Sequence, residues 1–444
     1  MNHRLPQTLR ILPLLLGLHG LSAQARGESE FGEFSFDVEA FEPKFFEFNG
    51  YMEVEPSYQR SNQDGALYRL QFLDQQDDLQ DDIEKLLGTV ELEARVRKGI
   101  ASLNLQTHSE GTWSYQGDLE DHELYQGHLS LQPTPGLAID VGKKAMLWGK
   151  GYSWNPVAFV ETPKDTSDPD AAREGLWIAS FDWVKRFNDG PLRTVAFTPM
   201  ILPVHSEIND DFGEEGHNNL AAKLYLLYRD TDIDFMYLGN GSRSSRFGMD
   251  FSGNLLPNFE VHGELAYFTD VQHRTITPDC QEGPINEVDE VSYLLGARYR
   301  TEDDITMILE YYLNGLGNEE EVQKQYYRCV HEAWETGLTQ LPLPNSEEDF
   351  SADSFTDQNP MREYLNLRAW WDNPFDILYF TPSISVFRNL DDHSMSVTTN
   401  LEYTGFENWE LTASAVFSDL GDTLDEWGEK PGIYKLQFTA KYYF

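Results

Sequence analysis

The chain has 444 residues, enough for one large domain or roughly two to three ordinary ones. Hydrophobic residues make up 40%, the mean hydropathy is −0.51, and 75 acidic against 33 basic residues give a formal charge of −42. An aromatic share of 13% argues against a disordered chain, and beyond the N-terminus no run of about 18 apolar residues predicts a membrane-spanning helix.

The N-terminus is typical of a secretory signal peptide. Arg4 and Arg10 supply positive charge, residues 11–18 (ILPLLLGL) form a short apolar segment, and residues 23–25 (AQA) fit an A-x-A cleavage site. We predict a signal peptide over residues 1–25 and export of the mature chain; a short buried helix is the alternative interpretation. Residues 26–45 are predicted to form a short acidic periplasmic segment.

Residues 46–444 are dominated by segments in which apolar and polar residues alternate. This period of two is typical of strands with one apolar and one polar face. Most segments have about the 9–11 residues that a tilted strand needs to cross a bilayer. The pattern predicts 18 strands, over residues 46–59, 87–97, 99–108, 122–132, 137–147, 175–186, 191–201, 219–229, 232–240, 243–252, 258–268, 289–300, 305–315, 362–372, 376–388, 394–404, 409–418 and 434–444.

The predicted connections alternate between short turns and mostly long loops. Short turns on one side and long loops on the other are typical of an outer-membrane barrel. We therefore predict an all-β fold, a transmembrane antiparallel β-barrel of about 18 strands (range about 16–18), with short periplasmic turns and long extracellular loops. A soluble β-sandwich or propeller is the alternative, but about 18 strands enclose more space than side chains can fill.

The polar face of the predicted strands should surround a water-filled lumen of mixed charge. Such a lumen suits polar solutes and argues against a basic funnel for polyanions, so we expect no nucleic-acid partner. Alternatively, most of these charges pair with one another and only keep the lumen wet. The predicted pore-lining residues are Glu91, Glu93, Arg95, Arg97, Lys144, Lys223, Arg298, Arg300, Arg368, Lys435 and Lys441.

Several predicted loops are strongly acidic. Residues 74–84 (DQQDDLQDDIE) carry six acids and no base, and their apolar spacing predicts a short amphipathic helix. Acidic loops would attract cations to the outer mouth. They could also bind Ca²⁺ through carboxylate oxygens, or reflect adaptation to a salty habitat. The spacing matches no defined calcium loop, and no resident cofactor or metal is otherwise predicted.

The third long loop, over residues 148–174, is the most distinctive. It combines aromatic, basic and flexible residues at the outer end of the fifth strand. We predict that it folds inward and narrows the pore; the alternative is that it caps the rim and packs on neighbouring loops. The predicted constriction residues are Trp148, Lys150, Tyr152, Trp154, Asn155 and Arg173.

The stretch from Gly142 to Gly149 (GKKAMLWG) resembles a glycine-basic-x-x-x-x-Trp-Gly pattern found at a strand end in porin-like bacterial outer-membrane proteins. The 18-stranded alginate-export-type barrels look like distant relatives. Their lumen is strongly basic, whereas the lumen predicted here is balanced, which argues against polyuronate export. Some similar barrels are thought to work with inner-membrane transporters in moving lipids or hydrophobic compounds.

Cys280 and Cys329 are the two cysteines of the chain, and they lie in two consecutive long loops. In an oxidising compartment such a pair predicts a disulfide. The bond would tether the longest loop, either to hold a plug over the pore or to protect the loop from proteolysis.

The chain ends in a clear alternating strand, residues 434–444 (YKLQFTAKYYF), which must pair with the first strand to close a barrel. Its final Phe444 resembles the C-terminal signal of bacterial outer-membrane proteins. That resemblance implies recognition by the barrel-assembly machinery and a place in a Gram-negative outer membrane, among its lipids and lipopolysaccharide.

No G-x-S-x-G, H-E-x-x-H, P-loop or C-x-x-C motif is present, and we predict that the protein is not an enzyme. The predicted function is porin-like diffusion or facilitated transport of small polar or charged solutes. The alternatives are the outer-membrane part of a lipid or hydrophobic-compound export system, with an inner-membrane transporter as partner, and a receptor barrel acting through its acidic loops.

Overall fold

The computed structural model describes residues 45–75, 79–115, 117–162, 173–273, 275–341 and 353–444, so the predicted signal peptide and nearly all of the acidic N-terminal segment lie outside the described residues. The strands are β1 (Phe46–Ser61), β2 (Asp82–Lys98), β3 (Ala101–Ser114), β4 (Gly117–Thr134), β5 (Leu137–Lys144), β6 (Leu176–Arg186), β7 (Leu192–Val204), β8 (His217–Tyr228), β9 (Thr231–Leu238), β10 (Arg246–Leu256), β11 (Phe259–His273), β12 (Asn286–Arg300), β13 (Ile305–Leu313), β14 (Glu363–Trp371), β15 (Phe380–Asn389), β16 (Met395–Tyr403), β17 (Trp409–Leu420) and β18 (Gly432–Tyr443). The two α-helices are α1 (Ala66–Gln71) and α2 (Glu320–Glu335).

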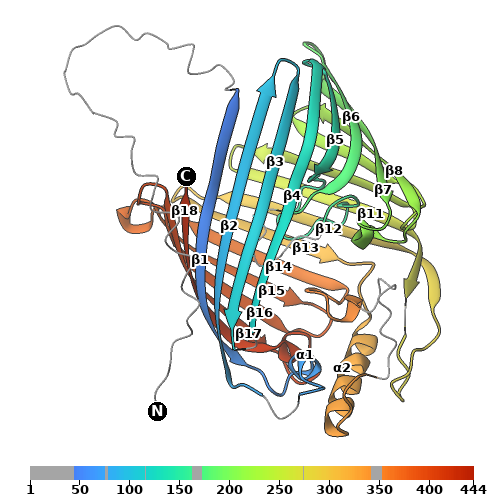
Figure 1. Ribbon diagram of the computed structural model, residues 1–444, viewed down its shortest axis with the longest axis vertical. Helices are drawn as coiled ribbons and strands as arrows, with labels where there is room; N and C mark the ends of the chain where they lie inside the picture. The colour runs from blue at the N-terminus through green and yellow to red at the C-terminus, as the bar shows by residue number, and fades with distance from the viewer. Residues whose placement is uncertain (1–44, 76–78, 116, 163–172, 274, 342–352) are drawn as a thin grey trace. The chain divides into compact units, whose positions relative to one another are not determined.

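Each strand pairs antiparallel with the next one along the chain, and β18 pairs antiparallel with β1 (Figure 1). The result is a closed 18-stranded barrel, which confirms the predicted fold class. Closure matters because it leaves no exposed sheet edge, whose unpaired N–H and C=O groups would be costly in lipid. No helix among the described residues is long and apolar enough to span a membrane.

The alternation of side chains sets which face of the sheet points outward. On β2, Val90 and Leu92 point to the outside and are exposed, whereas Glu91 between them points inward and is buried. The same apolar exterior recurs around the barrel. An apolar outer surface with a polar interior is the arrangement that a lipid environment favours.

The seam between the first and last strands closes through the chain terminus. The backbone of Gly50 donates to Phe444 O (3.2 Å) and accepts from Phe444 N (3.0 Å). The Phe444 ring lies 6.1 Å from the ring of Phe48, centroid to centroid. A Cβ at Gly50 would lie 2.9 Å from the Phe444 ring, so glycine is what allows the terminal aromatic to pack across the seam.

The connections show the predicted asymmetry, with two corrections. The sequence pattern leaves residues 109–121, between the predicted third and fourth strands, as a long loop. They do not form one, because β3 extends to Ser114, β4 begins at Gly117, and the two strands pair as one hairpin. The helix predicted over residues 74–84 is also wrong for the part that the structure describes, which excludes residues 76–78: residues 79–81 are not helical, and residues 82–84 belong to β2. Their ladder with β1 and the 3.0 Å ion pair of Asp82 with Arg60 outweigh the local helical spacing.

The long connections carry the two helices. Helix α1 lies in the first long connection and α2 in the 314–362 connection, a helix that the strand analysis missed. Side chains of both helices form one apolar cluster together with Phe355 from the same connection as α2. Its members are Ala66, Leu67, Tyr326, Tyr327, Val330 and Phe355. Glu429 joins this outer-loop cluster to the last long connection by accepting bonds from Ala66 N (2.5 Å) and the His331 ring (3.0 Å).

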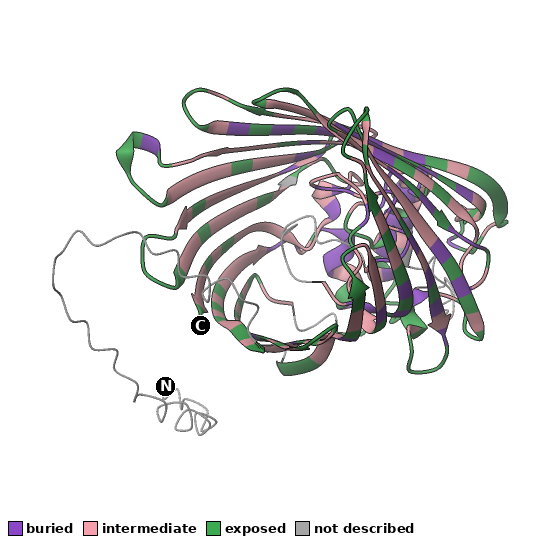
Figure 2. Cartoon of the chain, turned by 90° about the horizontal axis from the view of Figure 1, so that it is seen from above, coloured by how far each residue is buried: buried purple, intermediate pink, exposed green. Residues whose placement is uncertain are grey.

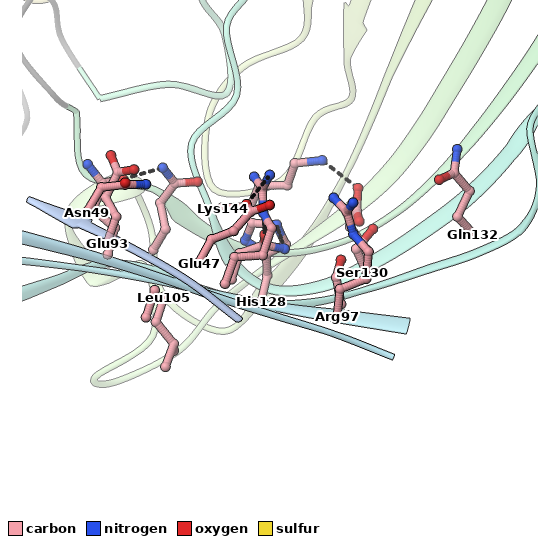
Figure 3. Close-up of a pocket in the computed structure, with 16 residues that line it drawn as sticks. Glu47, Asn49, Glu93, Arg97, Leu105, His128, Ser130, Gln132 and Lys144 are labelled. Atoms are coloured by element: carbon pink, nitrogen blue, oxygen red, sulfur yellow. Dashed lines mark hydrogen bonds and ion pairs between the residues drawn. The ribbon is translucent and has the colours of Figure 1, made fainter. Parts of the chain in front are cut away.

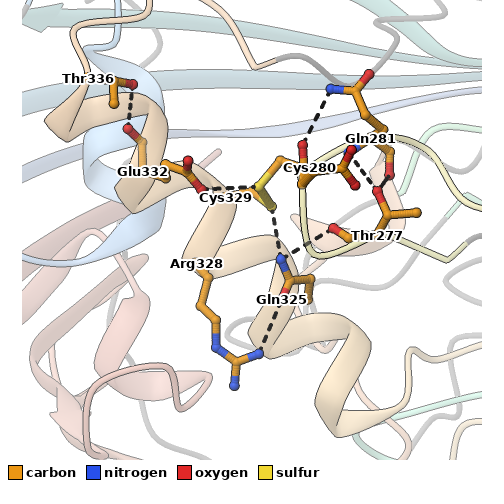
Figure 4. The surroundings of a disulfide bond; sticks show 9 residues. Thr277, Cys280, Gln281, Gln325, Arg328, Cys329, Glu332 and Thr336 are labelled. Atoms are coloured by element: carbon orange, nitrogen blue, oxygen red, sulfur yellow. Dashed lines mark hydrogen bonds between the residues drawn. A yellow bond between two sulfur atoms is a disulfide. The ribbon is translucent and has the colours of Figure 1, made fainter.

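The predicted disulfide between Cys280 and Cys329 is present, and it ties α2 to the preceding long connection (Figure 4). Beside it, the Gln325 side-chain amide donates to Thr277 O at 3.4 Å. Residues 353–361 also pack against α2, where Gln323 Nε2 donates to Phe355 O at 2.9 Å. The outer loops are therefore a packed layer with its own apolar cluster.

Candidate pore and inward loop

The chain leaves β5 after Lys144 and, over residues 145–162, runs into the barrel; we call this segment the inward loop. Figure 2 shows connecting segments inside the ring of strands. A carboxylate on β11, Glu264, holds the loop backbone. It accepts hydrogen bonds from Lys150 N (2.5 Å), Gly151 N (2.7 Å) and the Asn155 side-chain amide (3.0 Å). Glu264 is buried, so its charge is stabilised by these donors in place of water.

A second carboxylate, Glu310 on β13, holds the next turn of the inward loop. It accepts from Tyr152 N (2.7 Å) and Ser153 N (2.8 Å), and from the His262 ring at 2.9 Å. The Ser153 hydroxyl donates to Asn366 on β14 at 3.0 Å. The loop thus crosses from β11 to β14 on polar contacts to the inward faces of those strands.

Lys150 attaches the same loop to β9 and β10. Its ammonium lies 2.8 Å from the Asp234 carboxylate and 4.0 Å from that of Asp250. Burial would lower the pKa of Lys150, but the hydrogen bond to Asp234 and the nearby acids raise it above its ordinary value. Lys150 therefore stays charged as an anchor, and it is not free to attract anions.

The aromatic residues predicted for the constriction are packed against the wall. Trp148 is 2% exposed and joins Phe159 in an apolar cluster on the inward faces of β6–β9 and β11. Trp154 is 6% exposed and stacks on Tyr312, with ring centroids 5.3 Å apart. Both rings therefore bind the loop to the barrel, because an apolar inner wall offered more contact than the lumen did.

Arg173 forms a 2.6 Å ion pair with Glu161 at the end of the inward loop, and Glu161 also accepts a hydrogen bond from Trp148 N. Burial raises the pKa of Glu161 to about 7, against the opposing effects of these two partners. This carboxyl group therefore titrates near neutral pH.

A cavity of about 590 Å³ remains on the opposite side of the lumen, along the inward faces of β1–β5 (Figure 3). Among its charged lining residues, Lys144 pairs with Asp140 at 2.5 Å. Its uncharged lining is rich in amides and hydroxyls. The lining residues include Glu47, Asn49, Glu93, Arg95, Arg97, Ser102, Asn104, Gln106, Gln126, His128, Ser130, Gln132, Asp140 and Lys144.

The structure divides the predicted pore-lining residues among three environments. Four of them, Glu93, Arg95, Arg97 and Lys144, lie together in the cavity, and Glu91 lies next to it on β2. Lys435 and Lys441 on β18 pair with Glu55 (3.6 Å) and Glu53 (2.9 Å) on β1. The others lie elsewhere on inward strand faces: Lys223 on β8, Arg298 and Arg300 on β12, and Arg368 on β14.

Three of these last residues have contacts of their own, away from the cavity. Arg298 donates to the Tyr152 hydroxyl at 3.3 Å and so supports the inward loop. Arg300 pairs with Asp304 and Asp372 near the short turns. Arg368 lies over the Trp370 ring at 5.7 Å.

The acids that hold the inward loop were not predicted as site residues. The alternation places Glu264 and Glu310 on the inward face. They bond to residues 113 and 158 positions away in the sequence, so no local pattern shows that they hold the loop. The cavity amides Asn104, Gln106 and Gln126 were missed as well. The alternation could have identified them, because they are uncharged polar residues at inward positions of β3 and β4.

In the part of the chain that the structure describes, no group of three or more His, Cys, Asp or Glu side chains is placed to hold a metal ion.

No family model matches the chain. No curated protein matches it either. Among solved structures, the chain is similar to an engineered variant of the porin of Rhodopseudomonas blastica, at 12% identity and a TM-score of 0.42, covering 90% of this chain and 100% of the porin. It is also similar to OccK11 (OpdR) of Pseudomonas aeruginosa, at 11% identity and a TM-score of 0.48, covering 89% of this chain and 96% of that one. Neither likeness identifies a solute.

Proposed function

We propose that the protein is a non-enzymatic, porin-like channel for small polar or charged solutes. The observation that carries this proposal is the polar cavity of about 590 Å³ along β1–β5, left open by an inward loop that packs on other strands of the barrel, including β11 and β13. A wide barrel with a charged, hydrogen-bonding inner face holds water, and polar solutes replace that water at low cost. The inward loop sets the width of the passage.

The proposed location is the outer membrane of a Gram-negative bacterium, with the long loops facing outward among lipopolysaccharide. The apolar exterior supports a lipid environment, and the packing of Phe444 on the seam supports a role for the terminal strand in assembly. The barrel-assembly machinery is the proposed partner for that strand. Binding of Ca²⁺ by the acidic outer loops is a further proposal, which conductance with and without a chelator would test.

Conductance of the purified protein in a planar bilayer under a salt gradient tests the channel. Steady steps of current are expected, and the reversal potential gives the ion preference. Silence from protein whose β-content is intact by circular dichroism would contradict a channel.

The second candidate is a role in exporting lipid or hydrophobic compounds, together with an inner-membrane transporter. One observation favours it: the inner wall of β6–β9 is apolar, where Ile178, Met200 and Leu202 pack under the inward loop. Withdrawal of the loop would expose an apolar track. Binding of a fluorescent lipid to the protein, with no ionic conductance, would favour this candidate.

A further inference from the structure

The cavity has an ordered arrangement of charge along one strand. Inward positions of β2, read from its outer toward its short-turn end, are Glu91, Glu93, Arg95 and Arg97. Two acids therefore precede two bases on a single wall. Of these four residues, Glu93, Arg95 and Arg97 line the cavity. Glu47 lies opposite Arg95, and Asp140 lies in the same row as Arg97, so the order of charge belongs to β2 and not to the whole cavity.

Two of these four charges, Glu91 and Arg95, already have partners within the protein. Glu91 is buried and accepts from Gln106 Nε2 (2.9 Å) and the Tyr51 hydroxyl (3.3 Å). Arg95 donates to Asn104 at 2.6 Å and lies 3.8 Å from Glu47.

Glu93 and Arg97 are different. Both line the cavity, Glu93 is exposed, and Arg97 is half-buried. Within the described ranges neither side chain has an ion-pair or hydrogen-bond partner, so both charges are available to a ligand.

Neutral hydrogen-bonding groups lie on the strands beside these two charges. In register, Glu93 lies opposite Gln106, which lies opposite Gln126, and Arg97 lies opposite Ser102, which lies opposite Ser130. Gln126 donates to Gln106 at 2.5 Å, and Asn104 contacts the His128 ring at 3.1 Å. This surface matches the donors and acceptors of peptide groups.

We propose that the cavity is a binding site for short zwitterionic peptides, with the carboxylate at Arg97 and the ammonium at Glu93. Four residues along a strand separate these positions by about 13 Å, and the long side chains shorten that gap. An extended peptide of about two to four residues spans roughly 7–14 Å. A free amino acid is too short to reach both groups, and a simple anion or cation leaves one of them unpaired.

A role for this site in solute passage rests on the proposed channel function, but peptide binding can be measured without transport. The protein is purified from outer membranes in detergent, and trialanine, N-acetyl-trialanine and trialanine amide are titrated into it by calorimetry. Each cap removes one terminal charge at nearly constant size. We expect trialanine to bind roughly tenfold more tightly than either capped form, the effect of one charge-assisted hydrogen bond.

Two variants test which residue binds which terminus of the peptide. Glu93→Gln should weaken trialanine and remove its advantage over the N-acetyl form, whereas Arg97→Gln should remove its advantage over the amide. Glu302→Gln and Arg229→Gln, in short turns away from the cavity, are the matched controls and should bind as the wild type does. Equal affinity for all three peptides, or equal behaviour of the site and control variants, overturns the site.

Conductance of the same preparation separates the two proposals. Peptide binding with charge-dependent interruptions of the current supports both. Peptide binding without any ionic current supports the site and overturns the channel. A KCl current that the peptides leave unchanged, without calorimetric binding, overturns the site and leaves the channel standing.

Discussion

Glu264 should control how firmly the inward loop stays in the lumen, and Glu264→Gln tests this. The carboxylate accepts from Lys150 N, Gly151 N and the Asn155 amide at 2.5–3.0 Å, and from Val157 N at 3.4 Å. A glutamine side chain has only one acceptor oxygen for these donors. Its NH₂ group is itself a donor and cannot accept a hydrogen bond from the backbone N–H groups.

The free-energy cost of Glu264→Gln depends on the number of hydrogen bonds lost and on the removal of one buried negative charge. Losing about two charge-assisted hydrogen bonds costs roughly 3–6 kcal/mol. Glu264 lies opposite Asp250, which lies opposite Asp234, so removing one buried negative charge offsets part of that cost. We therefore expect the lower limit, about 3 kcal/mol, which raises the population of the detached loop roughly 150-fold.

Two assays report the detached loop. Single-channel recording should show larger and noisier current steps for Glu264→Gln. Trypsin should cleave after Lys150 much faster, since its ammonium is held by Asp234 only while the loop is seated. Glu302→Gln, an acid in a short turn between β12 and β13, is the matched control. Wild-type conductance and wild-type cleavage in folded Glu264→Gln protein would refute the anchoring role.

Three further perturbations test the seam, the disulfide and the buried acid of the loop. Gly50→Val should destabilise the closed barrel by about 1–3 kcal/mol, because a Cβ there would lie 2.4 Å from Glu91 O. Urea unfolding in detergent measures the loss of stability. An unchanged unfolding midpoint would contradict the prediction. Replacing Cys280 and Cys329 by serine removes a disulfide that spans 49 residues, and it should lower the stability of the α2 layer by up to about 4 kcal/mol. Amide hydrogen exchange in α2 should become faster while the β-content stays unchanged. Unchanged exchange would count against the tether. Burial raises the pKa of Glu161 to about 7, so its contribution to stability is present below its unfolded pKa and is lost as pH rises through about 7. Current noise should therefore rise across that range in the wild type and stay flat in Glu161→Gln; the same rise in both would dismiss this residue as the cause.

Sequence periodicity was sufficient for the barrel because strand alternation is a local property. The final strand, predicted over residues 434–444, was found within two residues of its observed bounds, Gly432–Tyr443. The helix predicted over residues 74–84 failed because the competing ladder with β1 is a long-range contact that no local pattern reveals. The path of the inward loop could not be predicted from the sequence for the same reason, because its anchors on β11 and β13 are distant in the chain.

The formal charge of −42 is a poor guide to what a solute meets inside the barrel. Some acids, such as Glu264 and Glu310, are buried and bind backbone N–H groups, so their charge is satisfied away from the passage. The cavity itself is lined by equal numbers of charged acids and bases: Glu47, Glu93 and Asp140 against Arg95, Arg97 and Lys144. The surplus negative charge therefore lies outside this cavity, and salt screens its exposed part beyond about 8–10 Å. If the protein is the channel proposed above, entry depends on a screened acidic mouth, and selection inside depends on the balanced polarity of the wall formed by β1–β5.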